Sequence, residues 1–150
     1  MLAEASRVLR PGGLIFLGEW IRLPADSTGL SPPGVTAFCE VLDSSLLCEY
    51  SISNLPLHLS HFVSQLGSFD DIQSRDYYMP IGDWTPCARD LGVKFRQTLR
   101  TWADSAAMVI AKAGYDEEAV DRLVNGFIGE ISGVSGLQVT YRVVIARRVA

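Results

Sequence analysis

The stretch RVLRPGGLIFLGE, residues 7–19, decides the fold of this chain. Its two arginines suit the negative C-terminal end of a helix, and Pro11 cannot continue that helix. Gly12 and Gly13 then supply the unhindered backbone that a sharp reversal needs. The apolar run Leu14–Leu17 is too short for a typical helix but suits a strand that is covered on both faces. We therefore predict a helix, a tight turn and a buried strand of the parallel type.

Composition limits the class of protein. The 150 residues include 13 basic and 17 acidic side chains, a net charge of −4, and 48% hydrophobic residues. This is enough to build one sizeable core, and it is not the composition of a disordered chain. No basic run occurs, so we exclude nucleic acid as a partner. No signal-peptide or membrane-spanning pattern occurs either, so we expect an intracellular, cytoplasmic protein that does not bind membranes.

The residues that most often bind metals are few. The three cysteines, Cys39, Cys48 and Cys87, are an odd number without CxxC spacing, so we predict free buried thiols rather than a disulfide or a zinc site. His58 and His61 are three apart on a predicted helix, which is the spacing of half a metal site or of a catalytic base. No cysteine or carboxylate pair lies near them in sequence. We therefore expect surface or partly buried histidines and no metal site.

The segment after the first strand is predicted to be an insertion. Residues 22–34 contain three prolines and two glycines and predict a loop. Helical spacing of apolar residues then runs from Val35 to about Glu49. A short helix is predicted from Pro56 to Leu66, where Gly67 ends it. We interpret residues 22–66 as a lid or substrate-side insertion.

The second half of the chain contains two further strands and two helices. Residues 68–80 mix polar and apolar side chains as a sheet-edge strand does. Apolar residues three and four apart predict a long helix over 95–113. Asp116 is a suitable N-cap for a third helix with an apolar stripe over 120–131. Alternation over 138–145 predicts a closing strand that ends in two arginines.

These segments resemble a known family. RVLRPGG followed by a hydrophobic strand that ends in an acid resembles the late core motif of class I S-adenosylmethionine-dependent methyltransferases. LGSFDDI, YYMPIGDW, AGYDEEAVDRLV and the terminal YRVVIARR are similar to a group of fungal methyltransferases associated with secondary metabolism. The resemblance implies an α/β fold: the last three strands of a Rossmann-like sheet, the final one antiparallel, with helices and a helical lid. Residues 1–150 would then be the C-terminal portion of a methyltransferase domain.

The same resemblance implies S-adenosyl-L-methionine as the cofactor. In this family a glycine-rich turn after the first strand approaches the donor, and an acid at the end of the second strand binds its ribose. Here Gly12 and Gly13 precede a strand, and no GxGxxG-like spacing occurs in the chain. No residue can therefore be assigned to the principal donor-binding motifs. We expect a truncated chain that is inactive alone.

The acceptor side is better represented. Glu19 and Trp20 lie where the first strand ends, and Tyr77, Tyr78 and Trp84 flank the turn after the next strand. Positions of this kind border ligand sites in open α/β sheets. We predict that these five residues line a pocket for a small-molecule substrate, and we assign no catalytic residue. Aromatic side chains at such spacing also occur as core or lid packing, and this alternative stays open.

Three hypotheses about function remain. The first is methyl transfer from S-adenosylmethionine to a small molecule. The second is a non-catalytic binding or regulatory module derived from a methyltransferase, and the third is half of another Rossmann-like protein such as a reductase. In the family sheet, the strand Leu14–Leu17 pairs with a strand that this sequence lacks, which leaves an unpaired apolar edge. We expect self-association or a complementing chain at that edge.

Overall fold

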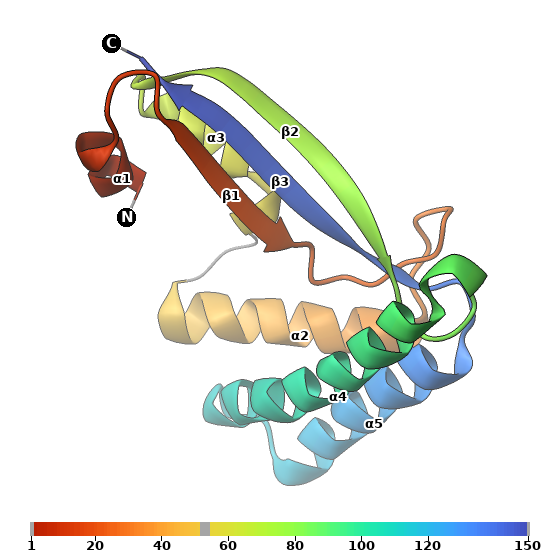
Figure 1. Ribbon diagram of the computed structural model, residues 1–150. Helices are drawn as coiled ribbons and strands as arrows, with labels where there is room; N and C mark the ends of the chain where they lie inside the picture. The colour runs from red at the N-terminus through yellow and green to blue at the C-terminus, as the bar shows by residue number, and fades with distance from the viewer. Residues whose placement is uncertain (1, 52–54, 150) are drawn as a thin grey trace. The chain divides into compact units, whose positions relative to one another are not determined.

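The computed structural model describes residues 2–51 and 55–149, and Figure 1 shows its helices and strands. The chain divides into two compact units, each assembled from segments that are distant in sequence. Unit 1 comprises Met1–Ile21, Asn54–Tyr77 and Thr140–Ala150, and unit 2 comprises Arg22–Ser53 and Tyr78–Val139. The predicted insertion 22–66 is therefore divided between the units at residues 53 and 54. Its role as a lid stays a prediction.

A three-stranded sheet is the framework of unit 1. The strands β1 (Leu14–Trp20), β2 (Phe69–Pro80) and β3 (Gln138–Arg148) lie in the order β1-β3-β2. β3 runs antiparallel to β1 and places Ala146 opposite Ile15. The chain thus has the predicted mixed α/β fold with an antiparallel final strand. The parallel character predicted for β1 is wrong, because the strand that pairs with it runs in the opposite direction.

Three short helical segments belong to unit 1: α1 (Leu2–Val8), the 3₁₀ turn η1 (Leu55–Leu57) and α3 (Leu59–Gln65). Side chains of α3 and of the three strands form one buried cluster: Ile15, Leu59, Val63, Phe69, Val144 and Ala146. Leu2, Ala5 and Leu9 at the N-terminal helix pack against this cluster. The single helix predicted over 56–66 is therefore a 3₁₀ turn followed by a short α-helix. Together these helices cover one face of the sheet.

The other face of β1 is open. Leu14 is 57% exposed and Phe16 is 64% exposed, whereas Ile15 between them is buried. The prediction that this strand is covered on both faces is wrong. An antiparallel sheet needs only one covered face, and the helices of unit 1 pack on the face that Ile15 occupies.

The glycine turn before β1 is confirmed. Gly12 has a φ of +77°, a left-handed value that glycine adopts without a side-chain clash. Its N–H donates to the carbonyl oxygen of Arg148 at 2.8 Å, and the N–H of Arg148 donates to the carbonyl oxygen of Gly13 at 2.8 Å. The turn therefore joins the start of β1 to the end of β3.

Unit 2 is a helical unit built from α2 (Pro33–Tyr50), the 3₁₀ turn η2 (Pro86–Ala88), α4 (Arg89–Lys112) and α5 (Glu117–Gly133). One aromatic ring from each long helix meets in its core. The ring centroid of Phe38 is 4.6 Å from that of Phe127 and 5.7 Å from that of Trp102. These contacts fix the three helices on one another.

The ends of two helices explain how unit 2 is assembled. The Asp116 carboxylate accepts a hydrogen bond from the N–H of Ala119 at 2.8 Å, which confirms the predicted N-cap of α5. α2 has no side-chain cap of its own. Instead, Glu130 of α5 accepts from the N–H of Val35 at 2.8 Å. A Cβ at Gly34 would lie 3.0 Å from the carbonyl carbon of Gly126, so the two helices cross closely at these glycines.

Candidate functional site

Three of the five predicted pocket residues belong to unit 1. Glu19 is exposed and Trp20 is half-buried at the end of β1, and Tyr77 is exposed on β2. Across the β1–β3 pairing, Trp20 lies opposite Tyr141. These positions place a carboxylate and an aromatic ring at the carboxyl end of β1, as predicted from the sequence.

The other two predicted residues belong to unit 2. Tyr78 is exposed, and the indole N–H of Trp84 donates to the carbonyl oxygen of Leu137 at 3.0 Å. This hydrogen bond holds the Trp84 ring in place. Because the five residues are divided between two units, their joining in one pocket stays a prediction.

Trp84 borders a small cavity of about 120 Å³ within unit 2. Its polar lining includes Asp83, Arg96, Ser132 and Ser135. The lining thus mixes a carboxylate and a guanidinium with two hydroxyl groups. Such a mixture attracts water and does not select a ligand of one charge.

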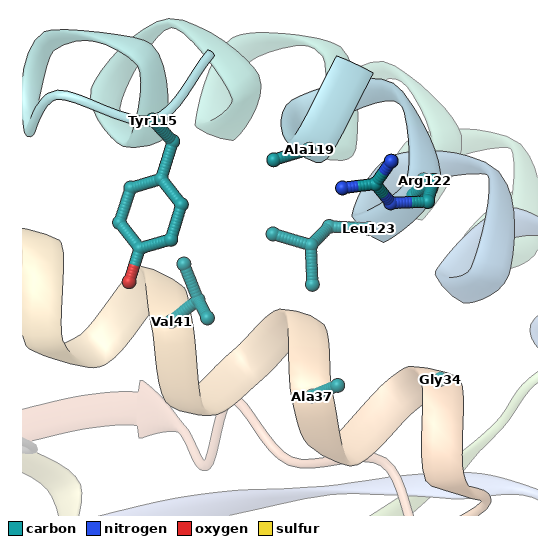
Figure 2. A pocket seen from close by; sticks show the side chains of 7 residues that line it. All are labelled: Gly34, Ala37, Val41, Tyr115, Ala119, Arg122 and Leu123. Carbon is teal, nitrogen blue, oxygen red and sulfur yellow. The ribbon is translucent and has the colours of Figure 1, made fainter. Parts of the chain in front are cut away.

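A larger hollow of about 310 Å³ lies between α2 and α5, and Figure 2 shows the residues that line it. The helices nearly touch at Gly34, and small side chains at Ala37 and Ala119 leave the space open. Arg122 lies at one side of the hollow and Tyr115 at the other. No carboxylate, histidine or cysteine is among the described residues that line it. The hollow can hold an apolar group, and Tyr115 and Arg122 supply its polar groups.

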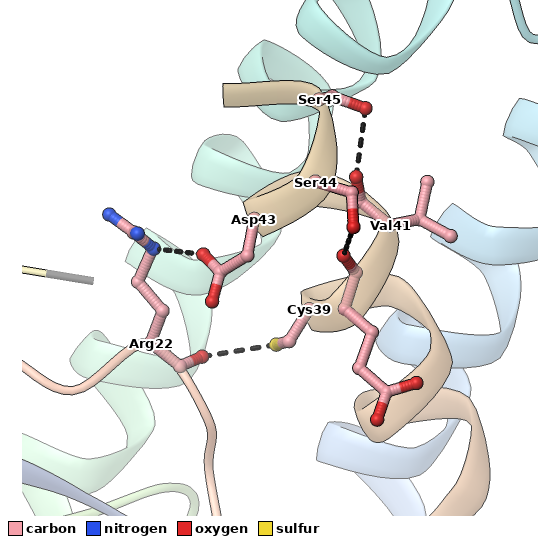
Figure 3. A network of polar contacts seen from close by, with 7 residues as sticks. Arg22, Cys39, Val41, Asp43, Ser44 and Ser45 are labelled. Carbon is pink, nitrogen blue, oxygen red and sulfur yellow. Dashed lines mark hydrogen bonds and ion pairs between the residues drawn. The ribbon is translucent and has the colours of Figure 1, made fainter. Parts of the chain in front are cut away.

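A polar network at the start of unit 2 contains a functional candidate that the sequence analysis missed (Figure 3). The Nε of Arg22 donates to Oδ1 of Asp43 at 2.7 Å, and the Arg22 side chain is only 15% exposed. Its Nη2 is buried and has no hydrogen-bond partner within the described part of the chain. A buried guanidinium N–H without an acceptor is costly, and an oxygen atom of a ligand would satisfy it.

The position of Arg22 in the sequence is the signal that was available. It is the second residue after β1, at the carboxyl end of the strand, where α/β sheets place ligand-binding groups. What the sequence does not reveal is its partner Asp43, which lies 21 residues further along.

The thiol in the same network is not a nucleophile. The Sγ of Cys39 donates to the carbonyl oxygen of Arg22 at 3.0 Å. Burial, with a further contribution from the nearby Asp43 carboxylate, raises the pKa of Cys39 to about 12. The thiol therefore stays protonated at neutral pH.

The other metal-binding residue types behave differently from one another. All three cysteines are free, but only Cys39 is buried, so the prediction of buried thiols is wrong for Cys48 and Cys87. His58 and His61 are exposed, as expected for surface histidines. No group of three or more His, Cys, Asp or Glu side chains that could hold a metal occurs among the described residues.

No helix in residues 2–51 and 55–149 is long and apolar enough to cross a membrane.

Comparisons with known proteins return one kind of match. No protein-family model and no curated protein matches the chain. Among solved structures, it is similar to phospholethanolamine N-methyltransferase 2 of Haemonchus contortus, in complex with phosphomonomethylethanolamine and S-adenosylhomocysteine. That alignment has a TM-score of 0.43 and 15% identity, and it covers 99% of this chain and 29% of the other. This chain thus spans less than a third of the length of that protein.

Proposed function

We propose that this chain is the acceptor-side part of an S-adenosylmethionine-dependent methyltransferase that methylates a small molecule in the cytoplasm. The observation that carries the proposal is the direction of the final strand: β3 runs antiparallel to β1. The resemblance of the RVLRPGG segment to methyltransferases implied this direction. The turn at Gly12 and Gly13 adds support, because it ties that segment to the end of β3. The fungal motifs quoted above favour a substrate of secondary metabolism.

The methyl donor would be bound by residues that are not among these 150. Methyl transfer from a sulfonium is an in-line displacement in which the enzyme chiefly positions the two reactants. A donor site therefore requires a shaped cradle for the nucleoside and the methionine moiety. No segment of this chain matches the glycine-rich turn that builds such a cradle. We infer that the chain acts within a longer polypeptide or with a complementing one.

The acceptor would be bound near the carboxyl end of β1. Glu19, Trp20, Tyr77, Tyr78 and Trp84 are the proposed pocket residues. Within unit 2, Arg22 is a separate candidate, because its buried and unpaired Nη2 is a donor for an oxygen atom of a ligand. Asp43 holds the guanidinium through its Nε and leaves Nη2 free for this role.

A second candidate function is a binding module without catalysis. The hollow between α2 and α5 favours it, because its lining is mostly apolar and contains no carboxylate, histidine or cysteine among the described residues. A ligand in that hollow would be held but not transformed.

The three tryptophans allow one experiment to separate these functions. Each indole N–H gives its own proton–nitrogen NMR signal, and Trp102 is packed between Phe38 and Phe127 as an internal control. A panel of small phenols, amines and carboxylates is added to the ¹⁵N-labelled chain. Shifts of Trp20 and Trp84 without a shift of Trp102 support the acceptor pocket. Shifts confined to the amides of Ala37 and Ala119 support the binding module instead.

A further inference from the structure

The hollow between α2 and α5 has the composition of a small-molecule site. Sites of this kind are mostly apolar and contain a few polar groups that fix the orientation of the ligand. Here the volume is about 310 Å³, and five of the seven lining residues are glycine, alanine, valine or leucine. The two remaining residues, Tyr115 and Arg122, therefore indicate which class of ligand the hollow holds.

These two residues lie at opposite sides of the hollow. Figure 2 shows Arg122 of α5 at one side and Tyr115, which precedes α5, at the other. The side chains of Val41 and Leu123 lie between them. Arg122 is the one charged side chain among the described residues that line the hollow. A ligand would thus meet a cation at one end and an apolar surface along the rest of its length.

Arg122 keeps donors available for such a ligand. Its Nη1 donates to Oε1 of Glu118, one turn earlier on α5. The Arg122 and Glu118 side chains are 64% and 84% exposed, and a pair this exposed contributes little because water screens it. A guanidinium has five N–H donors, so its Nε and Nη2 groups can still bind a carboxylate of a ligand through two parallel hydrogen bonds.

On the premise of the second candidate function, the binding module, we propose that the hollow holds a compact apolar carboxylic acid. Its carboxylate contacts Arg122, and its apolar body lies over Val41 and Leu123 toward the Tyr115 ring. Charge selects the acid, since Arg122 repels a cationic ligand and no described lining residue carries a carboxylate that would repel an anion. A neutral molecule of the same shape fills the same space but forms no ion pair with Arg122.

Two matched molecules test the preference for a carboxylate. 3-Phenylpropionate and its amide, 3-phenylpropanamide, have nearly the same shape, but only the first is charged at neutral pH. Each is titrated to millimolar concentration into the ¹⁵N-labelled chain, and the backbone amide signals of Ala119 and Leu123 report binding. We expect saturable shifts with a dissociation constant about fivefold lower for the acid than for the amide. No saturable shift from the acid, or equal constants for the two molecules, overturns the proposal.

Substitutions separate the charge from the space. Arg122→Gln should remove the preference for the acid and leave binding of the amide unchanged. Arg100→Gln is the matched control, because Arg100 is exposed on α4 and does not line the hollow. Ala37→Leu, at an exposed position of α2, fills the hollow and should abolish binding of both molecules. A preference that survives Arg122→Gln, or binding that survives Ala37→Leu, overturns the proposal.

The outcomes distinguish the class of ligand from the functions proposed above. If neither molecule binds but another member of the panel described above shifts the same amides, the class of ligand is wrong and the binding function stands. If no molecule shifts these amides, both are wrong. The indole signals of Trp20 and Trp84 test the acceptor pocket separately, because neither residue lines the hollow.

Discussion

Arg142 on β3 holds both carboxylate oxygens of Asp76 on the neighbouring strand β2. The Nε–Oδ1 and Nη2–Oδ2 distances are both 2.7 Å. The Arg142 and Asp76 side chains are 25% and 30% exposed. The hydrogen bonds from Arg142 lower the pKa of Asp76 below its ordinary value. This two-point contact ties the central strand of unit 1 to β2.

We predict that Asp76→Asn lowers the free energy of unfolding by about 1 kcal/mol at neutral pH. Because folding lowers the pKa of Asp76, its contribution is fully present above the pKa of the unfolded chain, about 3.9. It is lost as the pH falls through the lower pKa of the folded state. Urea unfolding at pH 7 and near pH 2 measures this difference. Asp70→Asn, at an exposed position of the same strand, is the control, and an equal loss at both pH values would contradict the interpretation.

Gly129 and Gly92 should respond to alanine in opposite directions. Gly129 lies inside α5, and a Cβ there would meet nothing within 4 Å. Gly129→Ala should therefore stabilise the chain by about 0.5–1 kcal/mol, because alanine loses less backbone entropy in a helix. A Cβ at Gly92 would collide with the carbonyl oxygen of Gly82, so Gly92→Ala should destabilise it. Thermal unfolding measures both, and shifts of the same sign would contradict this assignment.

Glu130 caps a helix that is not its own. Glu130→Ala removes the acceptor of the Val35 N–H, and we expect a loss of about 1 kcal/mol in the free energy of unfolding. Glu130→Gln keeps an acceptor oxygen of the same length and should retain most of that stability. Denaturant unfolding of both variants is the measurement. Equal losses for alanine and glutamine would show that the hydrogen bond is not the cause.

The three thiols should differ in reactivity. The pKa of Cys39, raised to about 12 by burial, leaves almost no thiolate at pH 8. Cys48 and Cys87 are exposed. We expect an aromatic disulfide reagent to modify these two thiols in the folded chain and Cys39 only after denaturant is added. Rapid labelling of Cys39 in the folded chain, located by mass spectrometry, would contradict its burial.

Local features were the predictable ones. The turn at Gly12, the N-cap at Asp116 and the stripes of the long helices follow from rules that act within a few residues, and the structure confirms them. The surroundings of β1 were not predictable in this way. An apolar run such as Leu14–Leu17 occurs both in strands covered on both faces and in antiparallel strands with one open face, so its sequence does not distinguish the two.

The same limit applies to the candidate site. Glu19 and Trp20 were identified because their position at a strand end is visible in the sequence. Arg22 was not, since its importance depends on Asp43, a partner on α2, and on the burial of one nitrogen. The exposure of Phe16 likewise depends on which elements fold back over the strand, and no local sequence pattern indicates that.

Isothermal titration calorimetry with S-adenosylmethionine tests most directly whether these residues provide the acceptor side without the donor site. The folded chain is titrated to millimolar donor, with S-adenosylhomocysteine as a second ligand. We predict no saturable heat for either ligand, because no segment matches a donor-binding turn. A saturable isotherm with one donor bound per chain would contradict this division and would place a complete donor site within the 150 residues.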